Sequence, residues 1–226
     1  MAGWLNNGKA GPLVWDLPTR FFHWTLVLLV VVAWRTAETR DLSTHIFAGS
    51  GVIGLLVFRL WWGLFGSSTA RFVSFVKGPK TVLAYARSLR HSALEPGHNP
   101  MGGWSVAGLL VCLILLTGFG LFADDVDALN PGPFSDKIDY DASRLASHLH
   151  AWAFDALEML ICAHLAAMLF YALFKRQNLV GAMVTGRQRH LDGHEDLQRG
   201  SPPMLVIGLV LGGAVTVYLA HLGGSF

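Results

Sequence analysis

The stretch that decides the fold is residues 150–174, HAWAFDALEMLICAHLAAMLFYALF. It is long enough for a helix to cross a bilayer, which takes about 20 predominantly apolar residues. His150 opens the stretch, and His164 lies inside it. Ionisable side chains are expensive in a membrane and usually serve a function there. The stretch therefore predicts a transmembrane helix with a functional role for its histidines.

Four other stretches approach the same length and apolar character. They are residues 21–37, 45–65, 104–123 and 204–222. Of the 226 residues, 53% are hydrophobic and only 14% are charged, whereas soluble domains have about 25% charged residues. The composition excludes an ordinary soluble domain. It predicts an all-α membrane protein with a transmembrane four-helix bundle and a fifth, C-terminal transmembrane helix.

Other features narrow the class of protein. A net charge of +2 is too small to favour a nucleic-acid partner, so the expected surroundings are membrane lipid. Cys112 and Cys162 lie inside apolar runs and read as small core residues. No Cys-x-x-Cys-His motif supports covalent haem attachment. The first twenty residues lack an apolar run behind a basic start, so we expect no cleavable signal peptide.

The charges between the spans differ in sign. Basic residues dominate between the second and third spans and after the fourth, whereas acidic residues dominate between the third and fourth. The basic residues are Arg71, Lys77, Lys80, Arg87, Arg90, Lys175, Arg176, Arg187 and Arg189, and the acidic ones are Asp124, Asp125, Asp127, Asp136, Asp139 and Asp141. The positive-inside rule predicts a cytoplasmic N-terminus and an outward-facing acidic loop. Residues 79–92 predict a short amphipathic helix on the cytoplasmic surface.

The histidines form two pairs in this topology. His150 and His164 are fourteen residues apart, which places them within about 40° of one helix face and about 21 Å apart along the axis. His148 falls on roughly the opposite face from His164. Chain direction places His45 at the outer depth of His150, and His23 at the cytoplasmic depth of His164.

Two histidine pairs at two depths indicate two metal centres stacked through the membrane. A large planar porphyrin held between two helices by one histidine from each satisfies the layout, and bis-histidine ligation suits electron transfer. Zinc needs three or four close ligands, which separated pairs do not supply. The alternative for any single histidine is a packed polar side chain hydrogen-bonded to a neighbouring helix.

Supporting residues carry less specific signals. Small residues that allow the close approach of a macrocycle or of another helix are Gly49, Gly51, Gly54, Gly102, Gly103 and Gly108. Arg20 and Arg59 are candidates to bind haem propionates, and the alternative is snorkelling to the membrane interface. Gly208 and Gly212 form a weak signal for a dimer or for helix docking.

Four motifs resemble the bacterial cytochrome b561 and nickel-hydrogenase b-type cytochrome family. They are VWDLPTRFFHW at 14–24, FRLWWG at 58–63, GHNPMGGW at 97–104 and QNLVGAMVTG at 177–186. The resemblance implies a four-helix bundle over residues 14–189 with two b haems, whose axial ligands fall on His23, His45, His150 and His164. Residues 190–203 are then a linker and residues 204–222 an additional transmembrane helix.

The sequence departs from the family in two respects. Ala151 follows His150, where the family commonly has an acidic residue, and His148 is a nearby alternative ligand. The fifth span is also an addition, because the family core usually ends soon after the fourth helix.

The resemblance also implies a function. Such proteins lie in the bacterial inner membrane and pass electrons between the quinone pool and a periplasmic partner, which is a c-type cytochrome or a hydrogenase. The alternative is a stand-alone quinone-linked oxidoreductase such as a superoxide oxidase. A third class is a non-redox anchor or transporter, which a visible spectrum would exclude. The acidic loop is either a docking site for a basic partner or a solvated outer loop.

Overall fold

The computed structural model describes residues 11–88, 97–124, 131–188 and 196–224. The described chain is helical, and five of its helices are long and apolar enough to cross a membrane. They are α1 (Leu17–Glu38), α2 (Leu42–Phe65), α5 (Pro100–Phe122), α6 (Tyr140–Phe174) and α8 (Pro202–Leu222). The five expected spans and the all-α fold are confirmed. Helix α6 begins at Tyr140, ten residues before the expected start at His150.

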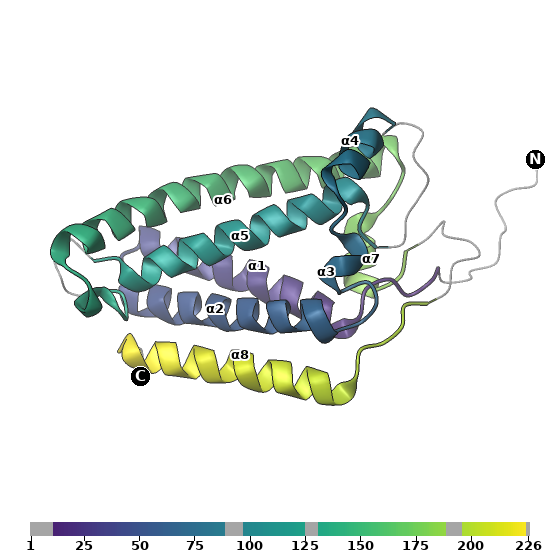
Figure 1. Cartoon of the computed structure of the whole chain (residues 1–226). Coiled ribbons are helices and arrows are strands. Elements are labelled where there is room, and N and C mark those ends of the chain that lie inside the picture. The colour runs from purple at the N-terminus through teal and green to yellow at the C-terminus, as the bar shows by residue number, and fades with distance from the viewer. Residues whose placement is uncertain (1–10, 89–96, 125–130, 189–195, 225–226) are drawn as a thin grey trace, which may run out of the picture.

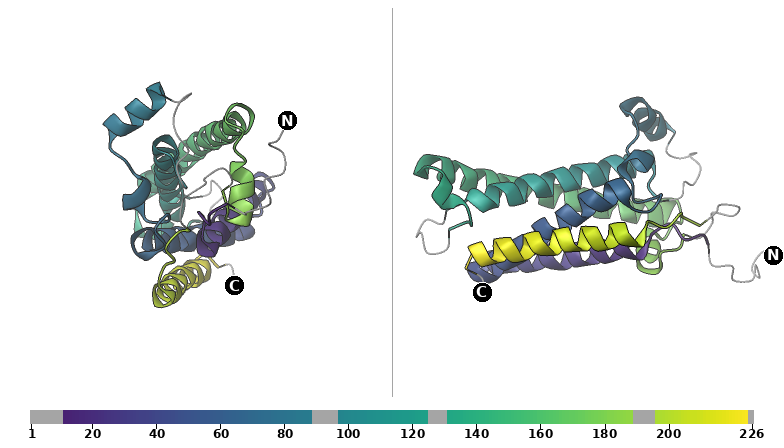
Figure 2. Two further views of the ribbon diagram at one scale, coloured as in Figure 1. Left: turned by 90° about the vertical axis from the view of Figure 1, so that its right-hand side faces the viewer. Right: turned by 60° about the horizontal axis from the view of Figure 1, so that its bottom comes forward.

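The helices form a four-helix bundle with α8 along its outside (Figure 1). Helices α1 and α2 make one antiparallel pair, and α5 and α6 make the other. Helix α8 packs on α2, and both views in Figure 2 place α8 away from α6. The bundle core contains the buried side chains of Leu56, Trp62, Leu113 and Leu157.

Small residues bring α8 onto α2. A Cβ added to Gly212 would lie 2.6 Å from the carbonyl oxygen of Gly54, so the two backbones are in direct contact. The indole of Trp61 also donates to the carbonyl of Met204 at 2.8 Å. The Gly-x-x-x-Gly of the fifth span is therefore used for docking within the chain, as small residues at helix interfaces commonly are.

Three short helices gather at the end of the bundle where α1 begins (Figure 1). They are α3 (Phe72–Phe75), α4 (Pro79–Arg87) and α7 (Leu179–Thr185). Helix α4 confirms the amphipathic helix expected from Pro79, although residues 89–92 of that expectation lie outside the described residues. The 3-10 turn η1 (Ser135–Lys137) lies at the opposite end. The expected linker is described only from Asp196, and α8 begins at Pro202, inside the range 190–203.

The helix ends are fixed by capping side chains that also join neighbouring helices. Asp16 accepts from the backbone of Thr19 at the start of α1 and from the indole of Trp62 at the end of α2. Asn99 caps α5, and its amide donates to the hydroxyl of Tyr171 at the end of α6 at 2.8 Å. Because each cap also bonds to a second helix, it sets the relative depth of the two helices.

Candidate functional site

The clearest pair of histidines joins α2 to α6 at the end of the bundle opposite the N-terminus. The ring centroids of His45 and His150 are 6.1 Å apart, and the rings are nearly perpendicular, at 85°. Two imidazoles need a centroid separation of about 6 Å to flank one metal ion with bonds of about 2 Å. The spacing therefore fits a single iron between the rings.

The orientation of both rings is set by the backbone. Nδ1 of His45 lies 2.8 Å from the carbonyl oxygen of Ala33, and Nδ1 of His150 lies 2.8 Å from that of Leu116. A carbonyl oxygen only accepts, so each Nδ1 carries the proton, and Nε2 is left as the nitrogen with a free lone pair. Metal-binding histidines usually have this arrangement, with the second nitrogen hydrogen-bonded to protein.

A cavity of about 250 Å³ surrounds this pair. Its walls come from α1, α2, α5 and α6, and glycines form part of them. A Cβ at Gly49 would meet no atom within 4 Å, whereas one at Gly120 would lie 2.9 Å from Cε1 of His150. Of the glycines near His45, Gly51 instead contacts Leu29 and Gly54 contacts α8. Gly49 therefore leaves space in the cavity, whereas Gly51 and Gly54 allow neighbouring helices to pack closely.

The second pair lies towards the other end of the bundle, where α1 begins. His23 and His164 lie close enough to interact electrostatically. Nδ1 of His23 is buried and has no hydrogen-bond partner in the described structure. His23 therefore lacks the carbonyl contact at Nδ1 that orients the rings of His45 and His150, and an unpartnered buried nitrogen is costly.

His98 is a further polar residue at this end. It belongs to the GHNPMGGW motif, and the sequence gives no reason to predict a ligand there. Its ring packs between Trp15, at a centroid distance of 4.6 Å, and Phe75, at 4.5 Å. Its Nδ1 is also buried and unpartnered in the described structure. Burial lowers the pKa of His98 to about 3, with smaller contributions from Arg59 and His164. His98 is therefore neutral at physiological pH.

The two arginines occupy different environments. Arg59 is only 2% exposed, donates to the carbonyl of Ala70 at 3.1 Å, and lies over the ring of Phe72. It is buried and does not snorkel to the interface. Arg20 donates to the carbonyls of Met183 and Val184 near the end of α7. The guanidinium of Arg20 is thus already used to hold α7 against α1.

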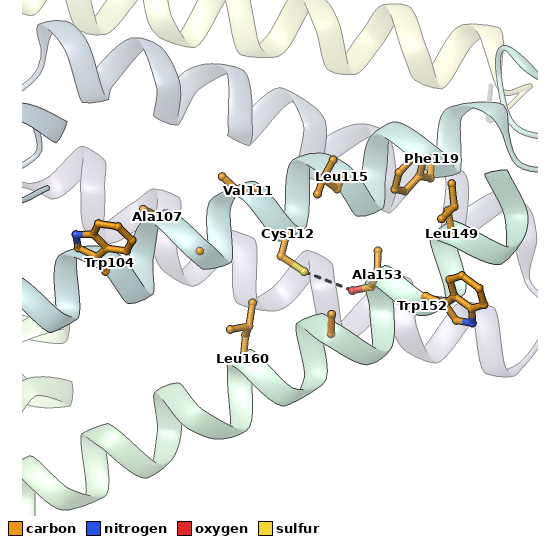
Figure 3. Close-up of a pocket in the computed structure, with 12 residues that line it drawn as sticks. Trp104, Ala107, Val111, Cys112, Leu115, Phe119, Leu149, Trp152, Ala153 and Leu160 are labelled. Atoms are coloured by element: carbon orange, nitrogen blue, oxygen red, sulfur yellow. Dashed lines mark hydrogen bonds between the residues drawn. The ribbon is translucent and has the colours of Figure 1, made fainter. Parts of the chain in front are cut away.

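Two further features carry no ligand chemistry. His148 is exposed on α6 and is not part of either pair. A groove of about 620 Å³ lies between α5 and α6 (Figure 3). It is lined by apolar residues, with the thiol of Cys112 turned towards the carbonyl of Ala153. Within the described ranges, no three histidine, cysteine or acidic residues cluster as a metal site. The candidate ligands therefore occur as pairs of histidines.

Comparison with known proteins identifies a family. Residues 14–186 match the family model described as prokaryotic cytochrome b561. No curated protein and no solved structure matches the chain. The match covers the bundle, both histidine pairs and α7, and ends before α8 begins. With five membrane-spanning helices and this match over most of its length, the chain belongs to the prokaryotic cytochrome b561 family, whose members are membrane electron-transfer proteins that bind b-type haem.

Proposed function

We propose that this cytochrome carries two b haems and passes electrons between the quinone pool and a periplasmic redox partner. The observation that carries the proposal is the His45–His150 pair, with its ring spacing of 6.1 Å and both Nδ1 atoms bonded to carbonyls. His23 and His164 are the proposed axial ligands of the second, cytoplasmic-side haem. Haem b held by these histidines would supply one-electron redox chemistry.

The protein's contribution is to hold the imidazoles in place. The carbonyls of Ala33 and Leu116 keep the protons of His45 and His150 on Nδ1 and restrain the rotation of the rings. Fixed ligands need little rearrangement when the charge of the centre changes, which favours electron transfer. The side chains that line the cavity around His45 and His150 are mostly apolar.

Arg59 is the stronger of the two candidates for binding a propionate. Its charge is buried, and its hydrogen bond to Ala70 involves only one guanidinium nitrogen. A buried charge is stabilised by partners of opposite sign. Asp16 lies close enough to act as one such partner, and Arg59 also lies close enough to influence His98 beside the inner pair. Arg20 stays a candidate, although its contacts with α7 give it a structural role as well.

The charge distribution supports an orientation in the bacterial inner membrane. The end with α3, α4 and α7 carries Lys77, Lys80 and Arg87, and it would face the cytoplasm by the positive-inside rule. The other end carries Asp136, where Lys137 donates to its carboxylate at 2.7 Å, and the first turns of α6. This acidic end would meet the periplasmic partner, a c-type cytochrome or a hydrogenase.

Reconstitution into liposomes tests this function. Purified protein should contain two haems per chain in a pyridine haemochrome assay. A membrane-soluble quinol should reduce both haems, and a basic c-type cytochrome added outside should then reoxidise them at a rate that falls with ionic strength. A single haem per fully loaded chain would contradict the two-site arrangement. Failure of the quinol to reduce the protein would contradict the link to the quinone pool.

A further inference from the structure

Helix α6 carries two carboxylates on its outward face. Asp155 and Glu158 are both exposed and lie between His150 and His164 in the sequence. At about 100° per residue, Asp155 points about 140° and Glu158 about 80° away from His150. The two acidic side chains therefore leave the bundle on a side that the haem ligands do not use.

Contacts with α5 fix the depth of these carboxylates. Ser143 donates to the carbonyl of Phe122, the last residue of α5, and Tyr171 accepts from Asn99, which caps the first turn of α5. The part of α6 between residues 143 and 171 thus runs beside the whole of α5. Its midpoint falls between Asp155 and Glu158, so both carboxylates lie near the centre of the membrane.

Carboxylates at this depth require an explanation. Acidic residues within transmembrane helices almost always face a bundle interior or a water-filled cavity, or pair with another charge. In the part of the chain that the structure describes, neither Asp155 nor Glu158 has an ion pair or a hydrogen bond. Their exposed position would therefore leave two unpaired ionisable groups in the lipid.

The same face is shaped for another helix. One exposed stripe continues along α6 at spacings of three and four residues. It contains Ala151, Asp155, Glu158, Cys162 and Ala166. Small side chains above and below the acidic pair allow the backbone of a second helix to approach closely. The groove of Figure 3 lies on a different side of α6, lined by Ala153, Ala156 and Leu160.

We infer that this stripe of α6 is the docking surface for a transmembrane helix of a partner protein, and that this helix carries an arginine or lysine at mid-membrane. Charge complementarity selects the occupant. A second copy of the chain does not supply the basic group at this depth. Among the arginines and lysines of the described spans, Arg59 is buried, Arg20 and Arg35 lie near the ends of α1, and Arg144 lies near the start of α6. This docking concerns assembly and is independent of the identity of the electron donor or acceptor.

Association with synthetic helices in liposomes tests the inference. The haem-loaded protein carries a donor fluorophore, and one peptide of leucine and alanine carries an acceptor and a central arginine. The matched peptide has leucine at the centre. Energy transfer should show the arginine peptide binding about tenfold more tightly, the range expected for a polar contact between helices in lipid. The Asp155→Leu/Glu158→Leu double variant should lose this preference.

The control variants distinguish the effect of carboxylates within the membrane from the effect of the total charge of the protein. The Asp136→Asn/Asp141→Asn variant removes two carboxylates outside the membrane and should keep the preference for arginine. The Asp155→Asn/Glu158→Gln variant keeps the side-chain shape, and the reduced visible spectrum verifies that each variant folds. Equal binding of both peptides to the wild type, or an unchanged preference in both mid-membrane variants, would overturn the inference. A homodimer that dissociates in those variants would also overturn it, by showing that the occupant is a second copy.

Discussion

Gly120 lies so close to the ring of His150 that a Cβ at this position would be 2.9 Å from the ring carbon Cε1. The absent side chain on α5 therefore helps to set the position of a candidate haem ligand on α6. The Nδ1 of the same ring also bonds to the carbonyl of Leu116, one helical turn earlier on α5.

Replacing Gly120 with valine should displace His150 and weaken binding at the outer site. Overpacking of this kind costs about 1–3 kcal/mol, so we expect loss of most of the outer haem from purified protein. Gly118→Val is the matched control, since a Cβ there meets no atom within 4 Å. Haem content and reduced spectra measure the effect, and equal losses in the two variants would contradict the role of Gly120.

Substitution of individual histidines should distinguish the two sites. His45→Ala or His150→Ala should remove the outer haem and leave the inner one, and His164→Ala should do the reverse. His148→Ala should leave both spectra unchanged, because that side chain is exposed and belongs to neither pair. Redox titrations followed by visible spectroscopy separate the two centres. Loss of a haem in His148→Ala, with none in His150→Ala, would reassign the outer ligand.

Removal of α8 should lower stability while leaving both haems bound. Truncation after Arg189 removes no proposed ligand, but it uncovers the face of α2 around Gly54 and Trp61 that α8 covers. We expect two haems per chain and a lower melting temperature in detergent. Gly54→Leu, which blocks the contact with Gly212, should have the same effect in the full-length chain. Loss of haem in both variants would show that the bundle needs α8 to assemble its sites.

Acidification should destabilise the protein through His98. The pKa of this buried imidazole is lowered to about 3, below the value of about 6.5 in an unfolded chain. The unfolded state therefore binds more protons as the pH falls below 6.5. Stability should then fall with decreasing pH, by up to roughly 1 kcal/mol per pH unit. His98→Phe should flatten the dependence of melting temperature on pH between 7 and 5, whereas His148→Phe should not. Identical slopes in all three proteins would rule out His98 as the origin.

The orientation can be tested by labelling in spheroplasts. Single cysteines replace Lys80 on α4 and Asp136 in η1, in a chain whose native cysteines are changed to serine. An impermeant maleimide added from outside should modify position 136 and spare position 80, because the basic end is expected in the cytoplasm. Modification of position 80 alone would reverse the orientation.

The sequence alone was sufficient to predict the membrane-spanning helices and which histidines of α6 share a helical face. The number of membrane-spanning helices follows from apolar length, and the relation of His150 to His164 follows from helical periodicity. The pairing of His45 with His150 was predicted from chain direction, and the structure does bring these rings together. Their role as haem ligands stays a prediction.

Only the tertiary structure decided contacts between residues far apart in the chain. Periodicity could not show that Gly49 lines a cavity while Gly54 meets α8, because both residues lie in one helix and are equally small. Nor could it show that His98 becomes buried between Trp15 and Phe75, or that Arg20 bonds to carbonyls near the end of α7. These contacts depend on how helices pack and where their caps fix their depth, and such distances are set by the folded bundle and not by local sequence.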